Sequence, residues 1–109
     1  VGMLEVNEGS FAAQVLQSTL PVMVEFGAEW CAPCKRLEPE LEKLAAEWKG
    51  SVVLAHVNID QNPTLTGQFG IMGVPTVILF VGGREVQRFS GLTSRDKIIQ
   101  KFSPYLTGK

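Results

Sequence analysis

Residues 22–35 read VMVEFGAEWCAPCK: an apolar run, a short turn, and then two cysteines three residues apart. The run over 22–26 is apolar apart from Glu25, which is typical of a buried strand. Gly27 ends this strand, and a helical pattern starts at the cysteines. Cys31 therefore lies at the predicted N-terminus of a helix, and this position determines the chemistry that we expect of it.

The helix after the cysteines has one continuous apolar face. That face is made by Leu37, Leu41, Leu44, Ala45 and Trp48. Pro39 lies inside this pattern and removes one backbone hydrogen bond, so we predict a single kinked helix rather than two helices. Gly50 ends the helix.

The remaining strands alternate with shorter helices. Besides 22–26, we predict strands over residues 3–6, 52–59, 76–81 and 84–89. Gly82 and Gly83 suit a two-residue hairpin turn, so the last two strands run antiparallel. Strands joined by helices run parallel, which predicts an α/β fold with a central mixed five-stranded sheet flanked by four helices. With no linker or repeat in view, residues 1–109 are interpreted as one domain.

Helix starts are indicated by capping residues. A first helix with Phe11, Val15 and Leu16 on its apolar face follows either Asn7 or Ser10 as a cap. Asn62 is predicted to cap a short helix that has Pro63 in its first turn. Ser94 is predicted to cap the last helix. The apolar face of that helix is made by Ile98, Ile99, Phe102 and Leu106.

The two cysteines are predicted to have unequal roles. The first backbone N–H groups of a helix carry partial positive charge and have no internal partner, so they stabilise a thiolate at Cys31. A lowered thiol pKa makes Cys31 the nucleophile. Cys34 lies about one turn further along the same face, deeper in the protein, and can resolve a disulfide formed on Cys31.

Two other interpretations of the cysteines are less favourable. A zinc site needs about four ligands, and apart from this pair the chain has only one histidine, His56, far away in sequence. A structural disulfide would close too small a loop to constrain the unfolded chain much. We therefore predict a redox-active pair and no metal site.

The chain resembles the thioredoxin family in several segments that follow the family's order. They are residues 26–35, Pro39, residues 57–63, residues 69–76 and residues 89–91. The resemblance implies a thioredoxin fold and a thiol–disulfide oxidoreductase that cycles between a Cys31–Cys34 dithiol and a disulfide. Such a protein is a general reductant of protein disulfides, which a thioredoxin reductase re-reduces with electrons from NADPH.

Glu25 is the most informative polar residue outside the cysteine pair. Either it lies on a sheet edge and reaches solvent, or it is a buried carboxyl with a raised pKa. In the second case it can accept the proton of Cys34 as that thiol attacks. The family usually has Asp here, so the extra methylene of Glu25 changes the geometry of this proton transfer.

His56 stands where the family often has a lysine. One interpretation places it beside Glu25, where its charge would favour the carboxylate. In the other, it is a strand histidine that packs and forms hydrogen bonds. The sequence leaves both open.

The resemblance also implies a substrate groove around the cysteines. It makes the Val74–Pro75 peptide bond cis, with the Val74 backbone free to pair with an extended substrate segment. Supporting and groove positions fall on Trp30, Ala32, Pro33, Lys35, Ile59, Gly73, Val74 and Gly91.

Two residues beside the cysteines depart from the family's usual pattern. Ala32 replaces a common glycine and should shift the reduction potential modestly. Gly27 replaces a common tryptophan, so we expect looser packing or a small apolar gap there.

Composition excludes several classes of protein. Of the 109 residues, 45% are hydrophobic and 19% charged, and the net charge is −1, which fits a globular protein with no basic surface for nucleic acid. No apolar run is long enough to span a membrane. Because no signal peptide is visible, we expect a cytoplasmic location. We also expect a monomer that binds no cofactor, since the chain has no Gly-rich dinucleotide fingerprint. An oxidant or isomerase of disulfides and a chaperone-like binding subunit remain the alternative functions.

Overall fold

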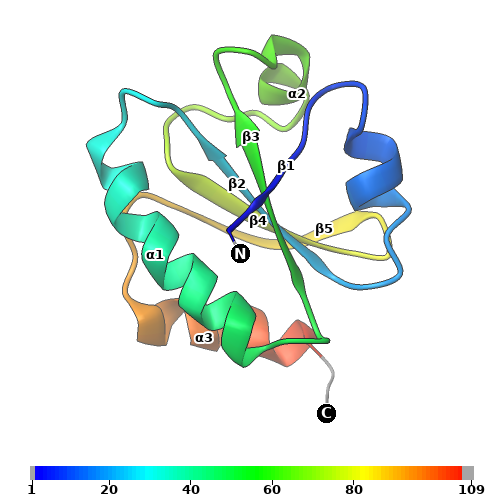
Figure 1. Ribbon diagram of the computed structural model, residues 1–109, viewed down its shortest axis with the longest axis vertical. Helices are drawn as coiled ribbons and strands as arrows, with labels where there is room; N and C mark the ends of the chain where they lie inside the picture. The colour runs from blue at the N-terminus through cyan, green and yellow to red at the C-terminus, as the bar shows by residue number, and fades with distance from the viewer. Residues whose placement is uncertain (1, 107–109) are drawn as a thin grey trace.

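The computed structural model of the protein describes residues 2–106, which form a sheet with helices on both sides (Figure 1). The strands are β1 (Leu4–Glu5), β2 (Val22–Gly27), β3 (Val53–Asn58), β4 (Thr76–Val81) and β5 (Arg84–Ser90). The helices are η1 (Ala12–Leu16), α1 (Ala32–Glu47), α2 (Pro63–Gln68), α3 (Arg95–Phe102) and the closing 3₁₀ turn η2 (Ser103–Tyr105).

The five strands form one mixed sheet in the order β1-β3-β2-β4-β5. β1, β3 and β2 run parallel, whereas β4 is antiparallel to both β2 and β5. Gly82 and Gly83 make the hairpin turn with φ values of 61° and 80°, which only glycine adopts without strain. The predicted sheet is therefore confirmed, although β1 is only two residues long.

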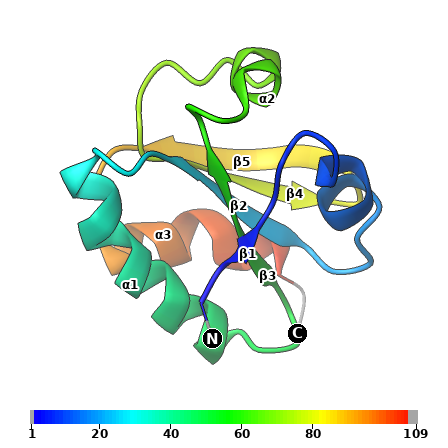
Figure 2. The ribbon, with the colours of Figure 1, turned by 45° about the horizontal axis from the view of Figure 1, so that its top comes forward.

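Side chains of β2 alternate between two apolar cores. Met23 faces the core beneath α1 and α3, together with Leu37, Leu41, Ile98 and Phe102. Val24 and Phe26 face the other core, beneath η1 and α2. Figure 2 shows α1 and α3 on one side of the sheet and α2 on the other. By the same alternation, Glu25 and Gly27 lie on the α1 side.

The first helix differs from the prediction because it is a short π-helix. Gln17 N–H donates to the Ala12 carbonyl at 2.9 Å, a bond that spans five residues. Neither candidate cap is the N-cap residue, which is Phe11 and has no side-chain cap. Asn7 and Ser10 instead bond within the preceding turn: Asn7 Oδ1 accepts from the Gly9 N–H at 2.9 Å, and the Ser10 hydroxyl accepts from the Asn7 N–H at 3.1 Å. The predicted apolar residues Phe11 and Val15 are nevertheless buried.

Asn62 is the N-cap residue of α2, as predicted, but its side chain makes no capping hydrogen bond. Its amide instead donates to the Asn58 carbonyl at 2.9 Å, and its Oδ1 accepts from the Glu8 N–H at 3.0 Å. The first turn of α2 is capped by Glu8, whose carboxylate accepts from the Thr64 N–H at 2.7 Å. Asn62 thus joins two segments of the chain, and an acid distant in sequence takes over the capping role.

The other two helices follow the prediction more closely. α1 is one continuous helix through Pro39, and Gly50 follows it with a φ of 86°. The Ser94 hydroxyl accepts from the first turn of α3, as predicted. α3 ends at Phe102, so Leu106 packs against the core from beyond the helix. No helix within residues 2–106 is both long and apolar enough to cross a bilayer.

Candidate redox site

The two cysteines form a disulfide at the N-terminus of α1, with their Cα atoms 5.3 Å apart. Cys31 is the N-cap residue, and its Sγ accepts a hydrogen bond from the Cys34 N–H at 3.1 Å. Cys31 is 3% exposed and Cys34 0%. The Cys31 sulfur therefore faces the helix N–H groups and lies slightly nearer the surface than that of Cys34. This arrangement fits an attacking thiol at Cys31 and a resolving thiol at Cys34.

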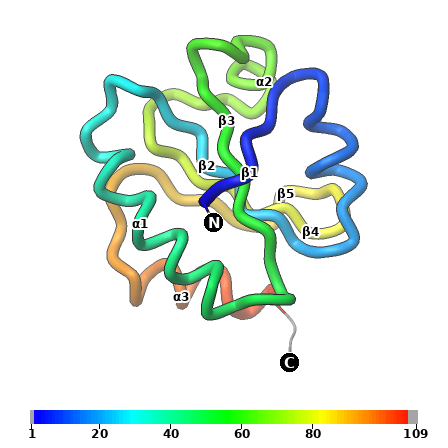
Figure 3. The backbone as a smooth tube through the Cα atoms, in the orientation of Figure 1, coloured from blue at the N-terminus to red at the C-terminus, as the bar shows by residue number. Residues whose placement is uncertain are grey.

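Four loops meet at the disulfide. Ala28 is buried against both cysteines, and Ile59 and Val74 pack against this small cluster. Figure 3 shows the loop that precedes α1 passing close to the loop that precedes β4. The Val74–Pro75 bond is cis, as the resemblance implied. The Gly91 N–H donates to the Pro75 carbonyl at 2.8 Å, which brings the β5–α3 loop to the same site.

Several predicted groove positions are open to solvent. They are Trp30, Ala32, Lys35 and Gly73, while Pro33 and Gly91 are partly buried. The Trp30 ring is held by a hydrogen bond from its indole N–H to Asp60 Oδ2 at 2.8 Å. Met72, next to Gly73, is 96% exposed. No sequence signal distinguished Met72 from an ordinary core methionine.

Glu25 lies in the centre of the sheet, because its strand β2 pairs with β3 on one side and β4 on the other. The alternative of a solvent-exposed edge position is wrong, since Glu25 is 0% exposed. Neither carboxyl oxygen has a hydrogen-bond partner among residues 2–106. A carboxyl in this setting favours its neutral form.

The burial of Glu25 changes its acidity. Desolvation is the main cause that raises the pKa of Glu25 from the usual 4.5 to about 9. The nearby negative charge of Glu38 raises this pKa further. The Lys35 ammonium acts in the opposite direction but is weaker. Glu25 therefore holds a proton at neutral pH in the disulfide form and becomes a base as the pH approaches 9.

His56 is paired with Glu25 in the parallel register of β2 and β3. Its Nε2 lies 4.0 Å from Glu25 Oε1 and 4.0 Å from Glu38 Oε2. Its Nδ1 lies 2.8 Å from Glu5 Oε1, within hydrogen-bond distance. The two interpretations of His56 are therefore compatible. It lies beside Glu25, and it is also a strand histidine within hydrogen-bond distance of Glu5.

Comparison with known proteins identifies the family to which the chain belongs. The family model named Thioredoxin matches residues 2–103. The chain belongs to the thioredoxin family. It is a thiol–disulfide oxidoreductase that cycles between a Cys31–Cys34 dithiol and disulfide and carries electrons to protein disulfides.

The relatives include single-domain thioredoxins and a fusion protein. A thioredoxin of Rickettsia felis is 40% identical over 94 residues, which cover 86% of this chain and 90% of the relative. A thioredoxin of Alicyclobacillus acidocaldarius is 44% identical over 85 residues, 78% of this chain and 81% of the relative. A bifunctional thioredoxin reductase/thioredoxin of Mycobacterium leprae is 39% identical over 100 residues, 92% of this chain but only 22% of that protein.

The surroundings of Gly27, one of the departures from the thioredoxin pattern, differ from the small apolar gap expected there. A Cβ atom at Gly27 would lie 3.3 Å from each of Cys34 Sγ, Glu25 Oε2 and His56 Nε2. The space is therefore surrounded by polar atoms, and the expected apolar gap is absent from it. A side chain at position 27 would therefore press on all three of these groups.

Glu38 was not predicted from the sequence as a residue of this site. It lies in α1 four residues after Cys34, so one helical turn places both side chains on the same face. This spacing was the signal that could have found it. Glu38 matters because it is the main charged neighbour that raises the pKa of Glu25.

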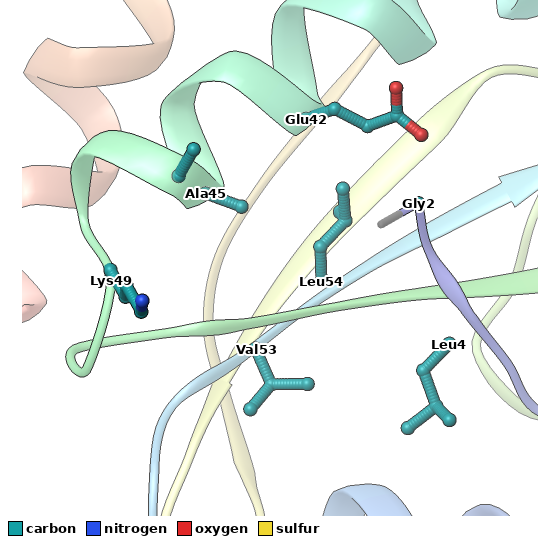
Figure 4. Close-up of a pocket in the computed structure, with 8 residues that line it drawn as sticks. Gly2, Leu4, Glu42, Ala45, Lys49, Val53 and Leu54 are labelled. Carbon is teal, nitrogen blue, oxygen red and sulfur yellow. The ribbon is translucent and has the colours of Figure 1, made fainter.

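Two hollows lie near this thioredoxin fold's α1 helix. One, of about 330 Å³, opens beside the redox site and is lined by Glu5, Lys35, Glu38 and His56 among others, so solvent reaches the histidine. The other, of about 460 Å³, lies between β1, β3 and the C-terminal half of α1 (Figure 4). Leu4 and Leu54 line this second hollow, and none of the predicted site residues does.

Proposed function

We propose that this chain is a cytoplasmic, monomeric, general reductant of protein disulfides, kept reduced by a thioredoxin reductase with electrons that come ultimately from NADPH. The observation that carries the proposal is the Cys31–Cys34 disulfide at the N-terminus of α1. A reductase partner is supported by the Mycobacterium leprae relative, whose name joins thioredoxin reductase and thioredoxin in one protein.

Reduction of a partner begins at Cys31. Its thiolate attacks one sulfur of the partner disulfide, a mixed disulfide forms, and the other partner sulfur leaves as a thiolate. The N-terminal N–H groups of α1 favour the thiolate form of Cys31. An extended partner segment can pair with the Val74 backbone, while Trp30 and Ile59 supply apolar contacts at the rim of the site.

Release of the partner depends on Cys34. This thiol loses its proton and attacks Cys31 Sγ, so that the Cys31–Cys34 disulfide forms and the partner leaves with both of its sulfurs reduced. Glu25, in its ionised form, accepts the Cys34 proton directly or through a water molecule. Since burial raises the pKa of Glu25 to about 9, this base becomes more available as the pH rises towards that value. His56 and Lys35 provide positive or polar groups on the solvent side.

Single-cysteine variants test the proposed order of attack. In Cys34→Ser the resolving step is lost, so incubation with a disulfide-containing protein should accumulate a mixed disulfide that non-reducing electrophoresis detects. In Cys31→Ser no such adduct should form. Accumulation of the adduct in Cys31→Ser rather than in Cys34→Ser would contradict the assigned roles.

A coupled assay tests the physiological direction. NADPH, a thioredoxin reductase and insulin as the disulfide substrate should consume NADPH only when the chain is present. The reduction potential of the same sample separates a reductant from an oxidant or isomerase. A potential well above that of the cytosolic glutathione pool would favour the oxidant or isomerase.

A further inference from the structure

Three potential metal ligands converge beside the disulfide from three different elements. Glu25 comes from β2, Glu38 from α1 and His56 from β3. One donor atom from each lies within 4.8 Å of the others. His56 Nε2 lies 4.0 Å from an oxygen of each glutamate. Ligands in a tetrahedral zinc site lie about 3.4 Å apart, given metal–ligand bonds of about 2.0–2.2 Å. Small side-chain rotations would therefore bring these atoms onto one ion.

The buried carboxyl of Glu25 is the independent sign of a ligand. This side chain is 0% exposed, and neither of its oxygens has a hydrogen-bond partner within the described part of the chain. Buried polar groups normally have hydrogen-bond partners. The two oxygens of Glu25 have none, although they lie near a histidine and a second carboxyl, so we infer that a ligand binds there. A cation would satisfy these oxygens.

The histidine is also oriented for this role. Its Nδ1 is 2.8 Å from Glu5 Oε1, and because an ionised carboxylate can only accept, Nδ1 carries the proton in that hydrogen bond. In the neutral ring, Nε2 is then the nitrogen with the free lone pair, and it lies 4.0 Å from an oxygen of each of Glu25 and Glu38. A carboxylate that holds the far nitrogen of a ligating histidine is the usual outer-shell arrangement at zinc sites.

Cys34 adds a fourth donor. Its Sγ, His56 Nε2 and Glu25 Oε2 all lie 3.3 Å from the point where a Cβ on Gly27 would stand, so the sulfur lies beside two of the three ligands. In the disulfide this sulfur is bonded to Cys31 and is not a thiolate. Reduction frees it, and the thiolate is the form of cysteine that binds metal.

We propose that Glu25, Glu38 and His56 form a binding site for a divalent transition-metal ion, best matched by Zn²⁺, which Cys34 completes when the cysteine pair is reduced. A set of one imidazole, two carboxylates and one thiolate favours Zn²⁺ over Mg²⁺ or Ca²⁺, which prefer oxygen ligands. Binding releases the protons of the Glu25 carboxyl and the Cys34 thiol. The ion enters through the cleft of about 330 Å³ lined by Glu38 and His56.

This site does not depend on the reduction of any partner protein. Because Zn²⁺ would occupy the resolving thiol and its base, the bound form should be inactive as a reductant. Metal binding and disulfide reduction can therefore be measured separately, and either result can fail without the other.

The experiment measures Zn²⁺ affinity by competition with a chromophoric chelator. The dithiol form is kept reduced with a phosphine that carries no thiol, and the disulfide form is measured without it. The dithiol form should bind at least tenfold more tightly. A tenfold ratio raises the reduction potential by 29.6 mV at saturating Zn²⁺, since the ion stabilises the reduced state. Co²⁺ should give a sulfur-to-cobalt charge-transfer band in the dithiol form alone.

Four variants locate the site. Glu38→Gln and His56→Gln each remove a ligand and should weaken Zn²⁺ binding by at least the roughly 10- to 100-fold that loss of an outer-shell partner costs. Gly27→Ala removes no ligand but puts a methyl group among the donors, and it should weaken binding comparably. Glu40→Gln is the matched control, because it lies in the same helix and pairs with Lys43 at the surface.

Two outcomes would overturn the proposal. Equal Zn²⁺ affinity in the dithiol and disulfide forms would remove Cys34 from the site. Wild-type affinity in reduced Glu38→Gln and His56→Gln would show that the two cysteines alone hold the ion. Circular dichroism of each variant shows whether a loss of binding comes from misfolding, and in that case His56→Asn supplies a second test of the same ligand.

Discussion

Replacing Glu25 by glutamine removes an ionisable group from the centre of the sheet with little change in shape. In the folded disulfide form the pKa of Glu25 is raised from its usual 4.5 to about 9, chiefly by burial. In the unfolded chain the same carboxyl ionises near 4.5. Between these two values, unfolding releases a proton, so the free energy of unfolding falls as the pH rises.

The size of the effect follows from the two pKa values. Stability from the neutral carboxyl is fully present below pH 4.5 and is lost progressively up to pH 9. One pKa unit corresponds to about 1.4 kcal/mol. From pH 5 to pH 8, wild-type protein should lose about 4 kcal/mol relative to Glu25→Gln, which has no such proton to lose.

Urea unfolding of the disulfide form at several pH values from 5 to 8 measures this difference. The disulfide form is chosen because neither cysteine titrates in it, and a chelator keeps metal ions away. Glu29→Gln is the control, since Glu29 is exposed close to the same site. It should differ from wild type by a constant of no more than about 0.5 kcal/mol.

The pH dependence of the stability, rather than the stability at one pH, distinguishes a neutral from an ionised Glu25. The buried amide of the glutamine variant has its own desolvation cost, but that cost is the same at every pH. A difference between wild type and Glu25→Gln that stays constant from pH 5 to pH 8 would refute the raised pKa. It would mean that Glu25 is ionised in the folded protein and has found a partner.

Three further changes in stability should be measurable by the same unfolding assay. Gly83→Ala would put a Cβ 2.7 Å from the Leu16 carbonyl oxygen at a φ of 80°, so it should lower the free energy of unfolding by at least about 2 kcal/mol. Gly82→Ala, with open space around it, should lower it by about 1 kcal/mol. Equal losses would contradict the close contact at Gly83. Ser94→Ala removes the side-chain cap of α3 and should cost about 1 kcal/mol, with Ser94→Asp retaining wild-type stability as the check. Phe80→Ala removes a 2% exposed ring that packs on two other phenylalanines and should cost about 4 kcal/mol; a loss below 1 kcal/mol would mean that the core closes over the gap.

Most of the fold could be predicted because its signals are local. The strand at 76–81 agrees residue for residue with β4, and Ser94 caps α3 as its position predicted. The errors arose where distant segments meet. Asn62 has the right residue type for a cap, but its side chain bonds Glu8 and Asn58 instead. The first helix has the right apolar face, yet the hydrogen bond between Ala12 and Gln17 gives it π geometry.

The redox pair belongs to the part that the sequence determined by itself. A strand, a turn and Cys31 at a helix start are consecutive in the chain, so the roles predicted for Cys31 and Cys34 rest on spacing and helix electrostatics alone. Only the tertiary structure decided the setting of Glu25. An isolated strand sequence does not reveal whether its neighbours pair on one side or on both, and that pairing separates an edge carboxylate from a buried acid.

The same reason explains the cluster beside the disulfide. Glu25, Glu38 and His56 come from three different elements. The parallel register of β2 and β3, together with the packing of α1, brings them together. Register and packing depend on the whole core rather than on local spacing. The sequence therefore predicted which thiols react, and the folded structure determined which acids and which histidine lie together beside them.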